Sequence, residues 1–222
     1  MANSVIVIPL YNPTELNYNI IKSYEKLDQQ LFDIIVVDNI STVTEYVDEI
    51  KKLDFIKYEL SEFNGGYETG AFYQVYRKTN YDTYFLVQDS IQIKSFNFFE
   101  TYSNYHAQYA LAFSPILNAH DRFDWGLENI YFNQHINEVL KLGKQFNGIM
   151  CNAFGIKKYL LTRVFNSELF SEKIIPKNKY DSMAWESCWP ILFEHSGISI
   201  EFLNPAESLE CKYFKKINQN RQ

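Results

Sequence analysis

Two short apolar runs near the N-terminus constrain the fold of this chain more than any other feature. They are Ser4 to Ile8 (SVIVI) and Asp33 to Asp38 (DIIVVD). Continuous β-branched runs of this kind are typical of strands covered on both faces in a parallel sheet. Thr14 can cap a helix between them, and that helix has its apolar residues at helical spacing: Ile20, Ile21, Tyr24 and Leu27. We therefore expect a right-handed βαβ unit whose two strands are parallel neighbours.

The alternation of strand and helix continues along the chain. We predict a helix over 43–53, a strand over 55–60, a glycine turn at 64–66 that leads into a helix through 71–77, and a strand over 84–87. Later strands are predicted at 110–114, 150–155 and 198–203, with a helix at 159–165. Residues 118–137 predict long loops with a short helix, and long loops are often functional. The predicted class is α/β: a single domain over residues 1–222 with a mostly parallel central sheet flanked by helices.

Composition and charge exclude several classes of protein. The chain is 46% hydrophobic and 22% charged, which is typical of a folded protein. Its net charge is -6 and its lysines are scattered, so a nucleic acid polymer is not an expected partner. No apolar stretch approaches the roughly 20 residues of a membrane span, and we expect a soluble, cytoplasmic protein. The cysteines lack CxxC spacing and are interpreted as free thiols: Cys151, Cys188 and Cys211.

Polar and glycine-rich segments follow four of the predicted elements. They are residues 9–12, 38–41, 64–70 and 88–90. In an open parallel sheet the binding crevice lies beyond the carboxyl ends of the strands, where such segments converge. We therefore expect the binding site there.

Four segments resemble, in their order and spacing, the nucleotide-binding elements of GT-A-fold glycosyltransferases of the large inverting family-two type. They are VIVIPLYNP, IIVVDNIS, NGGYETGAF and YFLVQDSIQI, and the resemblance covers roughly residues 4–93. It implies a GT-A (Rossmann-like) fold with a nucleotide-sugar-binding half at 1–93 and an acceptor-binding half at 94–222. It also implies an enzyme of polysaccharide biosynthesis that moves a sugar from a nucleotide-sugar, expected to be a UDP-sugar, to a saccharide or other hydroxyl acceptor with inversion.

The resemblance implies a set of residues that bind the nucleotide-sugar. Tyr11 would contact the base, and the Asp38 carboxylate would accept hydrogen bonds from the base or the ribose. In the glycine segment the backbone would approach the diphosphate closely, because glycine has no Cβ. The full implied set is Pro9, Tyr11, Asn12, Asp38, Asn64, Gly65, Gly66, Gly70 and Gln88. Two plainer interpretations stay open: Asp38 caps the next helix, and the glycines form an ordinary turn.

The resemblance also implies a divalent metal, Mn or Mg, at the end of the 84–87 strand, bound there by several carboxylates. This chain departs from that pattern, because Gln88 and Ser90 flank a single acid, Asp89. The implied ligands are Asp89, Ser90 and a late histidine, His195. The alternatives are that lysine, arginine or backbone amides stabilise the diphosphate, and that His195 is an ordinary surface residue.

Inverting transfer requires a general base that removes a proton from the acceptor hydroxyl. The segment from Asp181 to Trp189 resembles the acidic acceptor-side motif of the family, with Glu186 as the candidate base and Asp181 in reserve. Trp185 and Trp189 could raise the pKa of Glu186 by desolvation and stack on a sugar. The plainer interpretation is a helix with core tryptophans and a solvated glutamate. His120, Asp121 and Asp124 could contact the acceptor or be solvated.

Two rival functions remain open at this point. The first is a nucleotide-sugar-binding protein that has lost catalysis through Gln88 and Ser90. The second is a sugar-phosphate nucleotidyltransferase, although PLYNPTELN lacks the basic, glycine-rich loop expected after the first strand. A dinucleotide oxidoreductase is disfavoured because no GxGxxG follows that strand.

Overall fold

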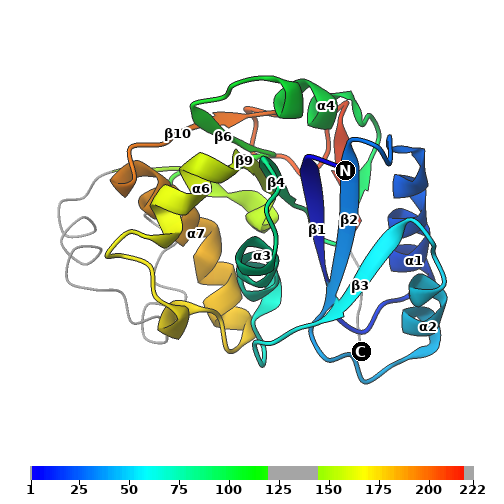
Figure 1. Cartoon of the computed structure of the whole chain (residues 1–222). Coiled ribbons are helices and arrows are strands. Elements are labelled where there is room, and N and C mark those ends of the chain that lie inside the picture. The colour runs from blue at the N-terminus through cyan, green and yellow to red at the C-terminus, as the bar shows by residue number, and fades with distance from the viewer. Residues whose placement is uncertain (1, 120–144, 218–222) are drawn as a thin grey trace.

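A seven-stranded sheet with the order β10-β6-β9-β4-β1-β2-β3 organises the molecule. The computed structural model describes residues 2–119 and 145–217 (Figure 1). The central strands β1 (Ser4–Leu10), β2 (Phe32–Asp38), β3 (Ile56–Leu60) and β4 (Thr83–Leu86) are mutually parallel. The expected βαβ unit and the α/β class are thus confirmed.

The remaining sheet strands come from the second half of the chain. β9 (Phe154–Lys157) runs antiparallel between β4 and β6 (Tyr109–Ala112), and β10 (Ser199–Phe202) pairs parallel with β6. The short strands β7 (Pro115–Ile116) and β8 (Gly148–Ile149) pair separately. β5 (Ile91–Ile93) pairs antiparallel with the C-terminal β11 (Phe214–Lys216).

The prediction of a strand at 150–155 is wrong for its first residues. Met150–Asn152 forms a 3-10 turn, η3, in which Cys151 has φ 59° and Asn152 has φ 51°. Left-handed backbone cannot continue a strand. The strand therefore starts only at Phe154, and the turn before it faces the site described below.

Helices cover both faces of the sheet. One face is covered by α1 (Glu15–Lys22), η1 (Ser23–Lys26), α2 (Glu45–Lys51) and α4 (Asn97–Asn104) (Figure 1). The other face is covered by α3 (Tyr67–Lys78), α6 (Lys158–Phe165), η4 (Glu172–Ile174) and α7 (Lys179–His195) (Figure 1). Alternate β1 side chains serve the two cores: Val7 belongs to the α3 side and Ile8 to the α1 side. As predicted, Thr14 caps α1, where its backbone N–H donates to Asn17 Oδ1 at 2.8 Å.

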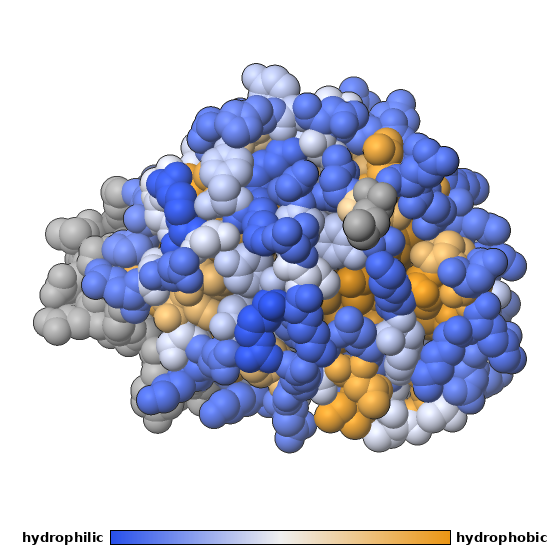
Figure 2. All heavy atoms as spheres, in the orientation of Figure 1, coloured by the Kyte–Doolittle hydropathy of each residue, from blue (hydrophilic) through white to orange (hydrophobic). Residues whose placement is uncertain are grey.

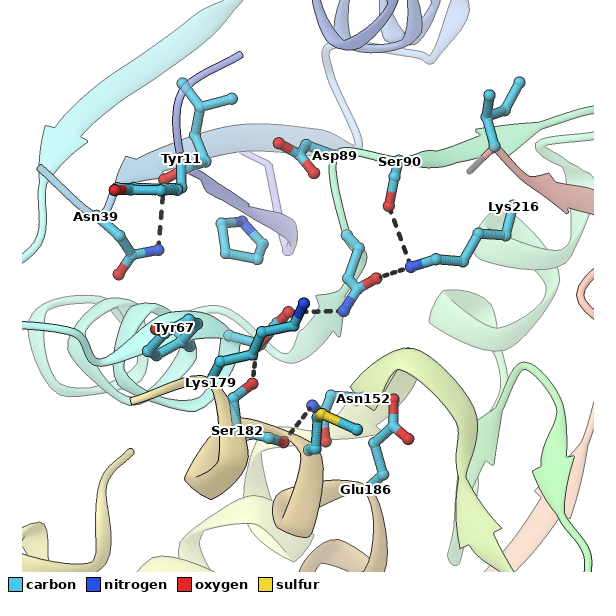
Figure 3. Close-up of a pocket in the computed structure, with 16 residues that line it drawn as sticks. Tyr11, Asn39, Tyr67, Asp89, Ser90, Asn152, Lys179, Ser182, Glu186 and Lys216 are labelled. Atoms are coloured by element: carbon cyan, nitrogen blue, oxygen red, sulfur yellow. Dashed lines mark hydrogen bonds between the residues drawn. The ribbon is translucent and has the colours of Figure 1, made fainter. Parts of the chain in front are cut away.

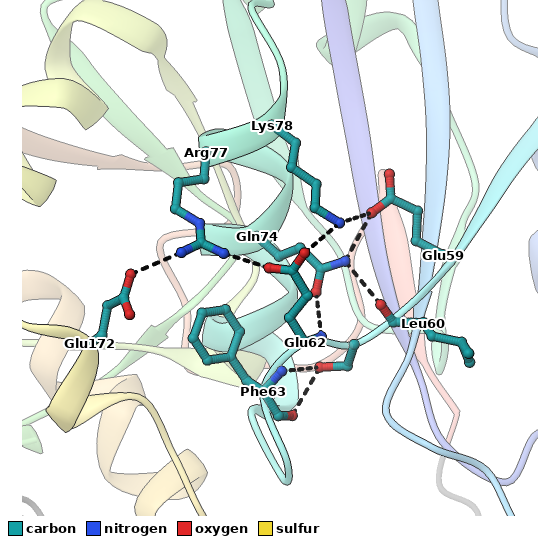
Figure 4. Close-up of polar contacts among 9 residues, drawn as sticks. Glu59, Leu60, Glu62, Phe63, Gln74, Arg77, Lys78 and Glu172 are labelled. Carbon is teal, nitrogen blue, oxygen red and sulfur yellow. Dashed lines mark hydrogen bonds and ion pairs between the residues drawn. The ribbon is translucent and has the colours of Figure 1, made fainter.

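A buried glutamine fixes the loop between β3 and α3. Gln74 Oε1 accepts from the Glu62 backbone N–H at 2.8 Å, and its Nε2 donates to the Leu60 carbonyl at 3.0 Å (Figure 4). Exposed ion pairs of Arg77 and Lys78 surround this contact. The glutamine therefore sets the point at which the chain enters α3 and hence the position of the first turn of that helix.

The surface in the orientation of Figure 1 is mostly polar, with separate apolar patches toward the side of β3 (Figure 2). The exposed large apolar side chains include Leu60 of β3 and Ile40 of the loop between β2 and α2. Within residues 2–119 and 145–217, no helix has the length and apolar character needed to cross a membrane.

Candidate functional site

A pocket of about 760 Å³ lies where β1 and β4 end, and it is lined by the first turn of α3, one face of α7, and β11 (Figure 3). Its volume is within the roughly 300–1,000 Å³ of small-molecule sites. The residues that line it are Pro9, Leu10, Tyr11, Asn39, Tyr67, Glu68, Gln88, Asp89, Ser90, Asn152, Lys179, Ser182, Met183, Glu186, Lys216 and Ile217.

Six residues predicted from the sequence meet in this pocket. They come from both halves of the chain: Pro9, Tyr11, Gln88, Asp89, Ser90 and Glu186. Pro9 lies near the end of β1 and Tyr11 directly follows that strand, the next three residues follow β4, and Glu186 is on α7. The strand-end rule therefore found the right edge of the sheet.

Glu186 faces the pocket because of helical spacing. Lys179, Ser182, Met183 and Glu186 lie at intervals of three and four on α7 and so share one face. Glu186 Oε1 accepts a hydrogen bond from the Cys151 backbone N–H at 2.7 Å. The pKa of Glu186 is raised to about 7. Burial is the main cause and the nearby Glu68 carboxylate adds to it, whereas the hydrogen bond from the Cys151 N–H and the charge of Lys216 oppose the rise.

The two tryptophans do not have the stacking role predicted for them. Trp185 and Trp189 are both 0% exposed, and Trp185 Nε1 donates to the Ile174 carbonyl at 3.0 Å. Their rings fill the core between α7 and the sheet and have no face open to a sugar. The expectation that they stack on a sugar is therefore wrong.

A hydrogen-bonded chain joins α3, β4 and α7 across the pocket wall. Glu68 accepts from Gln88 Nε2 at 2.6 Å through Oε1, and from the Ser182 hydroxyl at 2.5 Å through Oε2. Gln88 Oε1 in turn accepts from the Lys216 ammonium, which also donates to Ser90 Oγ at 3.2 Å (Figure 3). Each polar group orients the next, so this wall is preorganised.

Two tyrosines lie at the end of the pocket opposite Lys216 (Figure 3). Tyr11 is 46% exposed. Tyr67 begins α3 with φ 48°, a left-handed conformation that is uncommon for a bulky residue. Such strain is often kept where a side chain must have a particular direction, and here Tyr67 is directed to the pocket. The arrangement can accommodate a planar ring.

Asn12 and Asp38 do not line the pocket. The Asp38 carboxylate accepts from the Ser41 hydroxyl at 2.6 Å and also from the Tyr58 hydroxyl. Asn12 Oδ1 accepts from the Thr42 backbone N–H at 2.8 Å, and the Asn12 N–H donates to Ser41 Oγ. These bonds tie the loop after β1 to the loop after β2, where the neighbouring Asn39 reaches the pocket.

The three glycines of the 64–70 segment pack against neighbouring residues and do not line the pocket. A Cβ on Gly65 would lie 2.8 Å from the Lys177 carbonyl oxygen, and Gly65 has φ 70°. A Cβ on Gly66 or Gly70 would meet Phe63, at 2.6 and 3.2 Å respectively. Asn64 is exposed. Glycine is thus favoured at Gly65 by close packing against the segment before α7, and at Gly66 and Gly70 by contact with Phe63 inside the turn.

Asp181 and His195 also lie outside the pocket lining. Asp181 is buried in the first turn of α7, where Oδ2 accepts from the Lys177 backbone N–H at 3.1 Å. His195 ends α7, with Nε2 3.9 Å from Glu168. In the part of the chain that the structure describes, no three His, Cys, Asp or Glu residues form a group that could hold a metal ion. His120, Asp121 and Asp124 lie outside the described residues.

Sequence reasoning missed several residues of the site. Tyr67 and Glu68 stood within the quoted NGGYETGAF segment, and helical spacing from Glu186 would have indicated Ser182 and Lys179. Lys216 carried no such signal. It reaches the pocket only because β11 pairs with β5, immediately after Ser90.

Comparison of the sequence with protein families and curated proteins finds no match. Solved structures do match the fold. S. aureus TarS 1-349 aligns with a TM-score of 0.55 at 15% identity, covering 97% of this chain and 60% of that one. Its complex with UDP-GlcNAc gives a TM-score of 0.56 at 14% identity, covering 100% and 60%. A CMP:2-keto-3-deoxy-manno-octonic acid synthetase complexed with CTP gives 0.51 at 10% identity, covering 91% and 89%.

These similarities show the fold. The chain has the α/β, Rossmann-like architecture of the GT-A-type nucleotide-sugar transferases. It spans 60% of the length of the TarS 1-349 chain that it matches. The resemblance inferred from the sequence is confirmed at the level of the fold.

Proposed function

We propose that this chain is a glycosyltransferase that binds a nucleotide-sugar in the pocket and transfers the sugar to a hydroxyl acceptor. The observation that carries the proposal is Glu186, a carboxylate on the pocket wall whose pKa is raised to about 7. A general base is most effective when its pKa lies near the working pH. Glu186 shares the pocket with residues from the ends of β1 and β4, where ligands bind in such sheets.

The donor in this proposal is a UDP-sugar. The TarS structures that share the fold include complexes with UDP-GlcNAc and with UDP, which supports a uridine nucleotide. The uracil ring would contact Tyr11 and Tyr67, because planar rings stack favourably on a base. The diphosphate would then extend toward Gln88 and Ser90 at the end of β4.

In the proposed reaction Glu186 removes the proton from an acceptor hydroxyl as its oxygen attacks the anomeric carbon. The new glycosidic bond forms while the bond from the anomeric carbon to the diphosphate oxygen breaks, and UDP leaves with the electron pair. A single displacement inverts the anomeric centre. We propose a saccharide acceptor and a role in polysaccharide biosynthesis from the sequence resemblance alone.

A second candidate is transfer of a nucleotidyl group to a sugar acid or sugar phosphate. The similarity to the synthetase complexed with CTP favours it, and that match covers 89% of the synthetase chain. The two reactions differ in their products, because nucleotidyl transfer releases pyrophosphate and glycosyl transfer releases a nucleoside diphosphate. A third outcome, nucleotide binding without turnover, would identify a binding protein.

The test is a product assay on the purified protein. A panel of UDP-sugars is incubated with a mixture of saccharide acceptors, and CTP with sugar acids, while UDP and pyrophosphate release are followed separately. We expect UDP release that depends on the acceptor, reduced at least about 100-fold in Glu186→Gln. Glu25→Gln, an exposed glutamate outside the pocket, is the matched control. Pyrophosphate release, or full activity of Glu186→Gln, would contradict the proposal.

A further inference from the structure

The segment after β4 already binds a cationic group, the ammonium of Lys216. Gln88 and Ser90 flank Asp89 in the segment where a divalent metal was expected. Both side-chain oxygens accept a hydrogen bond from the Lys216 ammonium (Figure 3). The lysine therefore binds the side chains on both sides of Asp89, at the place where a metal was expected.

The position of Lys216 is fixed by backbone pairing. β11 lies antiparallel to β5, with Lys216 opposite Ile91, the residue that follows Ser90. The Lys216 backbone N–H donates to the Leu209 carbonyl at 2.7 Å, and the next N–H, of Ile217, donates to the Ser90 carbonyl at 2.8 Å. Backbone pairing thus holds Lys216 beside the segment that contains Gln88 and Ser90.

The Lys216 ammonium donates its hydrogen bonds to neutral oxygens. Its two hydrogen-bond partners are an amide and a hydroxyl, and it forms no ion pair with a carboxylate among the described residues. Glu68, which is close by, binds Gln88 Nε2 and so turns the amide oxygen toward the lysine. A lysine anchored by neutral oxygens on a pocket wall is available to bind an anion.

The residues at this point do not fit a divalent metal. Mg or Mn would need a hard oxygen set, usually with more than one carboxylate. Here Gln88 and Ser90 are bonded to Lys216, which leaves Asp89 as the one carboxylate of the motif. The two further carboxylates of the pocket, Glu68 and Glu186, accept hydrogen bonds from Gln88, Ser182 and the Cys151 N–H. The Lys216 ammonium would also repel a dication bound at the same motif. The Mn or Mg expected from the sequence resemblance therefore has no suitable ligand set at this motif.

We propose that the Lys216 ammonium takes the place of the divalent metal: it binds the diphosphate of the donor, and nucleotide binding and sugar transfer proceed without a metal. This inference rests on the proposed function. As the bond to the anomeric carbon breaks, negative charge grows on the leaving phosphate, and a fixed ammonium stabilises that charge. Gln88 and Ser90 hold the ammonium in place, which explains neutral side chains at both positions.

Calorimetric titration tests this directly. UDP and uridine are titrated into the full chain in EDTA and again in MnCl₂ or MgCl₂, because only UDP has the diphosphate. We expect the Kd of UDP to agree within about twofold in all three buffers. Lys216→Gln should weaken the binding of UDP roughly 10- to 100-fold in every buffer and should change the binding of uridine little in any of them. Lys216→Arg should restore part of the lost UDP affinity.

Two controls make the result specific. Lys215→Gln alters the neighbouring exposed lysine of β11, which pairs with Glu210, and should leave UDP binding unchanged. Lys179→Gln alters the other lysine that lines the pocket. Thermal unfolding of each variant checks the fold, and the EDTA comparison on the unaltered protein needs no variant.

The outcomes separate this inference from the proposed function. UDP binding that requires Mn or Mg would overturn the role of Lys216 and keep the glycosyltransferase proposal. UDP binding that is weakened by Lys179→Gln and not by Lys216→Gln would also overturn it. If neither UDP nor uridine binds in any buffer, both proposals fail together.

Discussion

The backbone N–H of Cys151 donates a 2.7 Å hydrogen bond to Glu186 Oε1, and so a left-handed turn holds the carboxylate on the pocket wall. Cys151 precedes Asn152, which also has positive φ and lines the pocket. The strained turn and the glutamate lie 35 residues apart in sequence. Strain of this kind, maintained at a pocket, is typical of a site that must fix the direction of its groups.

Transfer activity should rise with pH through about 7. The pKa of Glu186 is raised to about 7 by burial, and only its deprotonated form can accept a proton from an acceptor. We expect the rate at low substrate to increase about tenfold per pH unit below 7 and to level off above it. A profile with no inflection between pH 6 and 8 would remove Glu186 as the base.

The same carboxyl makes folding stability fall as pH rises. The folded-state pKa is above the usual value of 4.5, so the folded protein retains a proton that the unfolded chain releases. The contribution of this carboxyl to the free energy of unfolding is full below about pH 4.5 and is lost as pH rises through about 7. We expect the free energy of unfolding to fall by about 1–3 kcal/mol between pH 5 and 8 through this group, and this part of the pH dependence to vanish in Glu186→Gln. Urea unfolding of both proteins at the two pH values measures the difference.

Tyr11→Ala should weaken UDP binding and preserve the fold. The ring is 46% exposed and at the pocket mouth, so its loss leaves no core cavity. A stacked base contributes about 1–3 kcal/mol, and we expect UDP affinity to fall roughly 5- to 100-fold. Tyr105→Ala removes an exposed tyrosine outside this pocket and is the matched control. Equal affinities of both variants would show that the base does not contact Tyr11.

Gly65→Ala should destabilise the protein more than Gly197→Ala. Both glycines have positive φ, so each substitution costs about 1–3 kcal/mol in backbone strain. At Gly65 the new Cβ also meets the Lys177 carbonyl oxygen at 2.8 Å, whereas at Gly197 it meets only the guanidinium at the end of the long Arg163 side chain. The difference in urea unfolding free energy isolates the backbone clash. Equal losses would show that the segment before α7 can shift freely.

Gln74→Ala should cost about 2 kcal/mol of stability, because the Glu62 N–H and the Leu60 carbonyl lose their partner inside the β3–α3 loop. Lys78→Gln, which breaks exposed ion pairs beside it, should cost about 0–1 kcal/mol. Chemical denaturation compares the two variants. If Lys78→Gln were the more harmful, the surface charges would hold this loop.

Much of the fold follows from local patterns in the sequence. The β-branched runs of β1 and β2, the capped helix between them and the polar strand ends that carry Tyr11 and Asp89 were all identified, whereas Glu186 was implied by the family resemblance. A strand buried on both faces leaves a continuous apolar run, and parallel strands bring their carboxyl ends to one edge. Neither inference needs knowledge of a distant partner.

The tertiary structure decided which segments complete the site. Gln88 and Lys216 are 128 residues apart, and Glu68 and Ser182 are 114 apart. Periodicity reports which face of an element is buried and says nothing of what packs there. For the same reason the sequence could assign Trp185 and Trp189 to a sugar, although the structure buries them in the core. Gly65 likewise packs against the Lys177 carbonyl in the approach to α7, a requirement visible only once that segment is in place.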